Sequence, residues 1–196
     1  MEDLITVGDG KYKLEVYRDE FAESPRTWDN LGKMVCWHRR YMLGDKHGYG
    51  NPREFQESKE YKNAFVILPL YLYDHSGITI STCDFGDRFD SGQVGYIYVT
   101  KEQAKKEYHC ELDERLETTI RERLIGEVKM YDQYLQGDCY AFKIIDEQGE
   151  EIDSCGGFYG DELAEVLKEM RDSCNDEFGN LFNKMEKHSS AYTAMM

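Results

Sequence analysis

The stretch Phe65–Tyr73, with the sequence FVILPLYLY, has the length and apolar character of a central β-strand. Pro69 has no backbone N–H to donate to a neighbouring strand, so we expect this strand either to run along a sheet edge or to bulge at this residue. Ile78–Thr82 is the expected partner across the polar turn Asp74–Gly77, and Gln93–Val99 follows as a third strand. These residues predict a sheet in the middle of the chain.

Further strands lie on both sides of this group. Two pairs of extended runs flank short polar turns and are predicted as β-hairpins: Leu4–Val7 with Lys11–Tyr17, and Cys139–Ile145 with Glu151–Phe158. A short strand is expected at Lys33–His38. Each of these two hairpins is closed by a short turn, which joins antiparallel strands.

Helical patterns form separate runs. Thr100 and Gln103 have the spacing of a capping box, which predicts a helix over Lys101–Tyr108. Apolar residues at helical spacing predict a long helix from Leu112 to Leu135, and Gly137 suits its C-terminal cap. The same spacing predicts shorter helices at Leu163–Cys174 and Phe178–Met185, and a further short helix at Arg53–Lys62.

Strands and helices that each come in runs predict the α+β class, with a mostly antiparallel sheet and helices packed on one face. The length of 196 residues predicts a single α+β domain over residues 1–188, followed by a flexible C-terminal tail over residues 189–196. Periodicity predicts the following core residues: Phe65, Ile67, Leu70, Leu72, Ile78, Ile80, Val94, Tyr96, Leu116, Ile120, Leu124, Val166, Leu167 and Met170.

The chain is strongly acidic, with 39 acidic and 24 basic residues and a net charge of −15. That balance argues against direct nucleic-acid binding and against an anionic membrane surface as partner. No apolar run approaches the roughly 20 residues that span a bilayer, and the start Met1-Glu2-Asp3 does not resemble a signal peptide. We therefore expect a cytoplasmic protein.

The six cysteines show no C-x-x-C spacing, which argues against a zinc ribbon or a thioredoxin motif. We expect buried free thiols, and we assign no metal ligand, cofactor or catalytic residue. A metal site assembled in space from Cys83, His75 and the His109-Cys110 pair stays open as an alternative.

Negative charge is concentrated between Asp146 and Glu177, a segment that contains twelve acidic residues and only two basic ones, Lys168 and Arg171. One interpretation is a solvated hairpin and helix face. The other is a surface that competes with nucleic acid for a basic groove, since duplex DNA carries one negative charge per about 1.7 Å of axis. The expected contact residues are Asp153, Asp161, Glu162, Glu165, Glu169 and Asp172.

Two polar turns beside the central strands form an alternative polar site: Asp74, His75, Asp90 and Gln93. His75 with an aspartate could be an oriented base, and Cys83 or Ser91 a nucleophile. The competing interpretation is tight-turn chemistry, in which Asp and Ser bind backbone groups.

Two other segments contain residues that are typical of phosphate-binding sites. Gly156–Gly160 lies where a phosphate loop would be, but Asp161 and Glu162 are expected in the first turn of the next helix and would repel phosphate, so we interpret it as a turn and cap. The basic tripeptide at residues 38–40 could bind a phosphate or a carboxylate, although a surface loop without function is the commoner explanation.

Four segments resemble a family of mostly uncharacterised small proteins that are encoded by phages and mobile elements of Gram-positive bacteria: Pro69–Ser81, Asp90–Val99, Trp28–Gly32 and Val128–Asp138. Phe89 stands where the family version has a Trp. The resemblance carries no catalytic residues, and it implies a setting inside a bacterial host cell.

This setting, combined with the charge, predicts a binding protein that inhibits a host nucleic-acid-processing defence enzyme, such as a CRISPR nuclease or a restriction system, by steric and electrostatic competition. The expected partner is a host protein with a basic nucleic-acid-binding groove. The alternative is a small hydrolase or nucleotide-modifying enzyme that uses the polar turns around His75 and Asp90.

Overall fold

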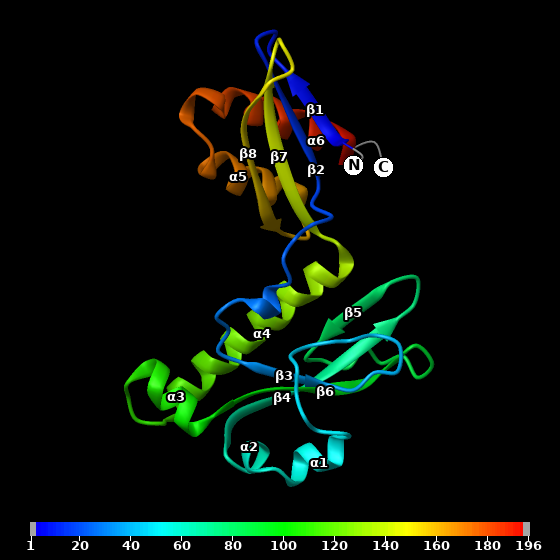
Figure 1. Cartoon of the computed structure of the whole chain (residues 1–196), viewed down its shortest axis with the longest axis vertical. Helices are drawn as coiled ribbons and strands as arrows, with labels where there is room; N and C mark the ends of the chain where they lie inside the picture. The colour runs from blue at the N-terminus through cyan, green and yellow to red at the C-terminus, as the bar shows by residue number, and fades with distance from the viewer. Residues whose placement is uncertain (1–2, 194–196) are drawn as a thin grey trace. The chain divides into compact units, whose positions relative to one another are not determined.

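A computed structural model describes the backbone of residues 3–193 and the side chains of residues 4–186. The fold is α+β, with two separate antiparallel sheets (Figure 1). The described residues form two compact units: unit 1 comprises the chain up to Glu23 and from Gly137 onward, and unit 2 comprises Ser24–Gln136. Where the sequence predicts one domain over residues 1–188, the structure has two units, each with its own sheet and core.

Unit 1 contains a four-stranded antiparallel sheet in the order β1-β2-β7-β8 (Figure 1). Its strands are β1 (Asp3–Gly8), β2 (Tyr12–Arg18), β7 (Cys139–Asp146) and β8 (Glu151–Tyr159). Its helical elements are α5 (Leu163–Ser173), the 3-10 turn η2 (Asp176–Phe178) and α6 (Gly179–Thr193). Both hairpins predicted from the sequence are present.

The core of unit 1 lies between one face of this sheet and the two helices. Leu14 of β2 and Phe142 of β7 are buried against Val166 and Met170 of α5, and against Phe182 of α6. The helices therefore cover one face, in agreement with the predicted layering. Helix α6 continues to Thr193, so residues 189–193 are helical where the sequence predicted a tail, and residues 194–196 lie outside the described part of the chain.

Unit 2 contains a second four-stranded antiparallel sheet in the order β3-β6-β4-β5. Its strands are β3 (Lys33–Cys36), β4 (Ala64–Asp74), β5 (Ile78–Ser81) and β6 (Ser91–Thr100). Its helices are η1 (Pro25–Thr27), α1 (Pro52–Glu57), α2 (Lys59–Lys62), α3 (Lys101–Tyr108) and α4 (Glu114–Gln136). The predicted helix Arg53–Lys62 is divided in two at Ser58, which caps α2.

Alternating residues of β6 point to the two faces of this sheet, and each face is covered. Ile97 and Val99 pack toward the long helix α4, in the larger hydrophobic cluster of the unit. Tyr96 and Tyr98 pack on the opposite face around Phe55 of α1. Helix α4 thus covers one face as predicted, and the short α1–α2 segment covers part of the other.

Pro69 lies within β4, which is an inner strand of the sheet, and its surroundings combine features of the two alternatives that the sequence left open. It pairs with Tyr96 of β6, but β5 pairs only with Tyr71–Asp74, so the segment around Pro69 has a strand neighbour on one side only. The pairing register of β4 with β6 also shifts between Leu70 and Tyr71, which is a bulge next to the proline. The missing N–H is therefore accommodated without a lost partner strand.

Candidate functional site

Helix α5 carries three of the predicted contact carboxylates on its exposed face. Glu165, Glu169 and Asp172 are exposed, whereas Val166 and Met170 of the same helix are buried in the core of unit 1. The spacings of four and three residues place the carboxylates on one side of the helix, with rises of about 6 Å and 4.5 Å between them. A partner could therefore meet all three together.

The other three predicted contact residues lie outside this helix. Glu162 is the N-cap residue, with φ −111° and ψ 110°, and Asp161 precedes it. Both are exposed, but neither occupies the first helical turn, which corrects the sequence prediction. The extended backbone of Glu162 delays the start of the helix to Leu163.

Asp153 is half-buried in β8 rather than open to solvent. Its carboxylate oxygen Oδ2 lies 3.6 Å from the Sγ of Cys174, which donates to it. Burial and this carboxylate raise the pKa of Cys174 to about 11, so the thiol stays protonated at neutral pH. Asp153 is thus partly engaged inside unit 1, and the carboxylates around α5 are more accessible than it is.

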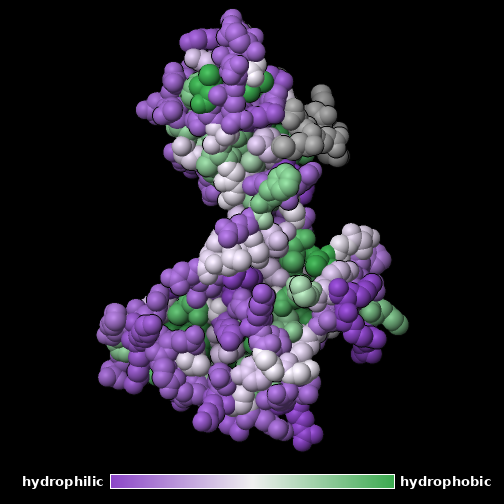
Figure 2. Space-filling model, viewed as in Figure 1, coloured by the Kyte–Doolittle hydropathy of each residue, from purple (hydrophilic) through white to green (hydrophobic). Residues whose placement is uncertain are grey.

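The charge of the chain is divided very unevenly between the two units. Unit 1 has 21 acidic and 8 basic residues, a net charge of −13, whereas unit 2 has 18 and 16, a net charge of −2. Most of the total of −15 therefore belongs to the smaller unit. In the view of Figure 2, hydrophilic residues cover much of the visible surface of both units.

Strand β8 forms one edge of the unit 1 sheet, where its outer side has no neighbouring strand among residues 3–193. Most of its side chains are exposed, including the apolar Ile152, which is 48% exposed. Gly156 and Gly157 lie within this strand, at a register shift against β7, and not in the turn that the sequence predicted. Acidic side chains along such an edge oppose its pairing with a second copy.

Three cysteines are exposed, which corrects the expectation of buried thiols: Cys83, Cys110 and Cys155. Cys36 and Cys139 are buried. Burial raises the pKa of Cys36 to about 12, so this thiol is unreactive at neutral pH. Among the residues that the structure describes, no three His, Cys, Asp or Glu side chains are placed to share a metal ion.

The polar turns of unit 2 line a cleft of about 390 Å³, which we call the turn cleft. Asp74, Asp90 and Gln93 line it, but His75 does not. The Nδ1 of His75 lies 3.1 Å from Oδ2 of Asp90, in a pair whose side chains are 63% and 40% exposed. The structure therefore brings the four residues of the predicted polar site into one region, with the histidine outside the cleft.

Asp74 is held by contacts within unit 2. Arg40 forms an ion pair with its carboxylate, and the hydroxyl of Tyr41 donates to Oδ1 at 3.3 Å. The backbone N–H of Asp74 donates to the carbonyl of Asp90 at 2.8 Å, which ties the two polar turns together. These bonds fit the turn-chemistry interpretation of Asp74.

His75 makes no hydrogen bond to a nucleophile among the described residues. Ser91 donates its hydroxyl to the backbone carbonyl of Asp87, and no hydrogen bond joins His75 to Ser91 or to Cys83. The carboxylate of Asp87 accepts the backbone N–H groups of Asp90 and Phe89, which lower its pKa. This pattern is that of an ordered loop, and it does not form a nucleophile–base pair.

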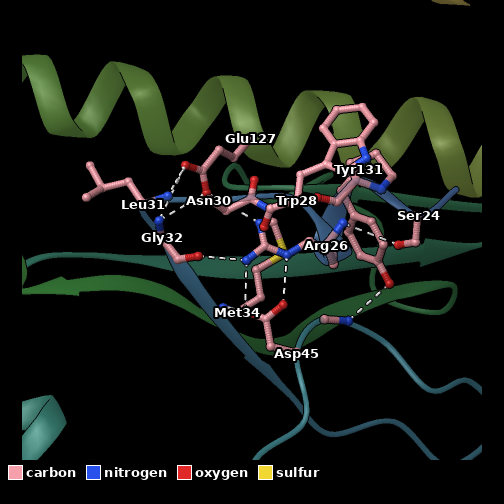
Figure 3. Close-up of polar contacts among 12 residues, drawn as sticks. Ser24, Arg26, Trp28, Asn30, Leu31, Gly32, Met34, Asp45, Glu127 and Tyr131 are labelled. Carbon is pink, nitrogen blue, oxygen red and sulfur yellow. Dashed lines mark hydrogen bonds and ion pairs between the residues drawn. The ribbon is translucent and has the colours of Figure 1, made fainter. Parts of the chain in front are cut away.

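A buried ion network that the sequence did not reveal lies beneath α4 (Figure 3). Arg26 donates to both carboxylate oxygens of Asp45, at 3.0 and 2.8 Å, and to Glu127 of α4 at 3.3 Å. Its side chain is only 5% exposed. Burial lowers the pKa of Arg26, but the two carboxylates outweigh this effect and raise it overall, so the guanidinium stays charged.

The carboxylates of this network also bind the backbone (Figure 3). Glu127 accepts the N–H of Leu31 at 2.9 Å, and Asp45 accepts the N–H of Met34 at 2.8 Å. The guanidinium donates to the carbonyl of Gly32 at 2.6 Å. The network thus joins η1, the start of β3, the following loop and α4, which makes it a structural element of unit 2.

The comparisons with known proteins give no relative. No family model, curated protein or solved structure matches the chain. In the part of the chain that the structure describes, none of the helices has the length and apolarity that crossing a membrane requires. Function must therefore be argued from the residues themselves.

Proposed function

We propose that this chain is a binding protein, and that the exposed carboxylates around α5 dock against a basic, nucleic-acid-binding groove of a partner protein. We call these residues the acidic surface: Asp161, Glu162, Glu165, Glu169 and Asp172. The observation that carries the proposal is the net charge of −13 on unit 1 against −2 on unit 2.

Charge complementarity supports a basic partner. A surface dense in carboxylates produces a negative potential that steers cationic surfaces toward it and repels nucleic acid. Such a surface can replace nucleic acid in a basic groove, because both neutralise the Lys and Arg side chains of the groove. The chain would then block the groove sterically, without chemistry of its own.

The resemblance described above supplies the proposed setting. Within a bacterial cell that carries a phage or mobile element, the partner would be a defence enzyme that processes nucleic acid, such as a CRISPR nuclease or a restriction enzyme. The enzymatic alternative has less support, because His75 lies outside the turn cleft and has no hydrogen bond to Ser91 or Cys83 among the described residues. We therefore favour inhibition by binding.

Affinity capture with matched variants tests the proposal. The parent chain and the variant Glu165→Lys/Glu169→Lys are immobilised and exposed to lysate of a Gram-positive bacterium. The control Glu111→Lys/Glu122→Lys makes the same charge change at exposed positions of unit 2. Exposed substitutions of this kind cost about 1 kcal/mol or less, so all three proteins should be folded, as circular dichroism can verify.

The proposal expects a captured protein that binds nucleic acid, that is retained by the parent and the control, and that is lost from the Glu165→Lys/Glu169→Lys variant. Added duplex DNA should release it, and rising salt should weaken its capture. Equal capture by all three proteins at low ionic strength would contradict the proposal and reduce the acidic surface to a solvated face.

A further inference from the structure

A cleft in unit 2 has the opposite character to the acidic surface of unit 1. Most residues of the segment 36–50, between β3 and α1, line a cleft of about 660 Å³ that we call the loop cleft. Small-molecule sites typically measure about 300–1,000 Å³. Its lining has four cationic or imidazole side chains and one carboxylate: His38, Arg39, Lys46, His47 and Asp45.

The two cations of this lining lack a counter-ion. Arg39 and Lys46 are exposed, and neither makes an ion pair or hydrogen bond with any residue in the described part of the chain. Asp45 is not their counter-ion, because both its carboxylate oxygens already bind Arg26. In a chain with a net charge of −15, two unmatched cations on one cleft favour an anionic ligand.

Flat side chains stand beside these cations. Trp37 and Tyr41 line the loop cleft, and the ring of His38 stacks on Tyr41 with a centroid distance of 5.0 Å and an interplanar angle of 5°. The Nδ1 of His38 accepts the backbone N–H groups of Arg40 and Tyr41, which fixes the orientation of its ring. Such rings offer stacking surfaces to a planar ligand.

His47 has an unmet hydrogen bond. Its Nε2 lies 3.0 Å from the carbonyl oxygen of Cys36, and because a carbonyl only accepts, Nε2 carries the hydrogen. The other nitrogen, Nδ1, is then an acceptor when the ring is neutral, and it is buried with no partner among the described residues. Because this atom is closed off from solvent, a ligand in the cleft does not contact it in this structure.

We propose that the loop cleft binds a ring-bearing phosphate of nucleotide size. The phosphate would contact Arg39 and Lys46, and the ring would lie against Trp37 or Tyr41. This chemistry is shared by a free nucleotide and by the phosphorylated end of a single strand. The proposal is independent of the acidic surface, which lies on the other unit.

Calorimetric titration of the full chain with adenosine 5′-monophosphate tests the site. We expect one saturable site per chain, with affinity reduced about tenfold or more by Arg39→Gln and by Lys46→Gln. The control Lys106→Gln removes an exposed cation from α3, away from the cleft, and should leave the affinity unchanged. Circular dichroism should show the same fold for all variants, because the three side chains are exposed.

Three further ligands separate the contributions of the phosphate and of the ring to binding. Adenosine should bind at least tenfold more weakly than the monophosphate, and inorganic phosphate should compete with it. A 5′-phosphorylated single-stranded oligonucleotide that binds more tightly than the monophosphate identifies a strand end as the source, and one that binds more weakly identifies a free nucleotide. The proposal is overturned if the monophosphate shows no saturable binding at millimolar concentration, if adenosine binds equally well, or if Lys106→Gln weakens binding as much as Arg39→Gln.

Discussion

Units 1 and 2 contain similar numbers of acidic residues, 21 and 18, but they differ in what these residues contact. In unit 2, Asp45 and Glu127 are largely buried and neutralise Arg26, while the other 15 basic residues nearly balance the other 16 acidic ones. In unit 1, the carboxylates around α5 are exposed, and only 8 basic residues oppose the acidic ones. The carboxylates of Asp45 and Glu127 thus stabilise unit 2, whereas the exposed carboxylates around α5 create a surface potential on unit 1.

The largest effect should come from the buried network of unit 2. Replacing Arg26 with Met leaves the largely buried carboxylate of Asp45 without its cation and leaves Glu127 with only Arg123, at 3.8 Å. Breaking a buried pair in this way costs about 3–5 kcal/mol. We expect unit 2 to unfold at markedly lower urea concentration, as measured by fluorescence of its two tryptophans, Trp28 and Trp37.

Arg53→Met is the matched control for this prediction. Arg53 is 86% exposed and pairs with Glu57 one helical turn away, so its loss should change the free energy of unfolding by about 0.5 kcal/mol or less. If the two substitutions had the same effect, the distinction between interior and surface charge would fail.

Among the described side chains of unit 1, Glu15 is a buried carboxylate that can be compared with this network. Burial raises the pKa of Glu15, but hydrogen bonds from Lys13 and Lys143 outweigh it and lower the pKa overall. Because the pKa of Glu15 is lower in the folded state, its ionised form stabilises unit 1 at pH values above the unfolded-state pKa of about 4.3. This stabilisation is lost as the pH falls through the folded-state pKa.

Glu15→Gln should therefore cost about 1–3 kcal/mol at neutral pH, because charge-assisted bonds to Lys13 and Lys143 are replaced by neutral ones. Below the folded-state pKa, the parent and the variant should converge in stability. Urea titrations at a series of pH values measure both effects, and a stability difference that persists unchanged at low pH would contradict the sign of the shift.

A smaller effect should appear on addition of salt. Screening relieves repulsion among the excess carboxylates of unit 1, so its amide protection should rise with ionic strength by about 1 kcal/mol or less. Unit 2, with its nearly balanced charge, should respond less. Hydrogen exchange resolved by residue compares the two units in one sample. An equal response of both units to salt would argue against repulsion among the excess carboxylates of unit 1.

The fold class and most elements follow from local sequence signals. The capping box of Thr100 and Gln103 and the positive φ of Gly137 after α4 are both present, because each depends on a few neighbouring residues. The hairpins of unit 1 were predictable for the same reason. Local signals of this kind need no knowledge of the tertiary fold.

The division into two units was not predictable from periodicity. The apolar stripes that contain Leu116 and Val166 look alike in the sequence, yet they belong to separate clusters in separate units. An apolar stripe reveals which side of a helix is buried, but it does not reveal which core it joins.

The candidate sites show the same limit of sequence-based prediction: local features are predictable, and long-range contacts are not. The exposure of Glu165 and Glu169 followed from the phase of α5, which is local. The network of Arg26 did not, because its partners Asp45 and Glu127 lie 19 and 101 residues away in the sequence. Contacts at such separations leave no spacing pattern that a single sequence could reveal.

Paramagnetic relaxation with small charged nitroxides tests most directly whether charge plays different parts in the two units. The relaxation enhancement caused by a cationic probe and by an anionic probe of equal size is measured at every amide. The ratio of the two enhancements reports the local electrostatic potential. The account predicts a strong preference for the cationic probe at α5 and β8, and little net preference across unit 2 apart from an anionic preference near Arg39 and Lys46. An equal cationic preference over both units would contradict it.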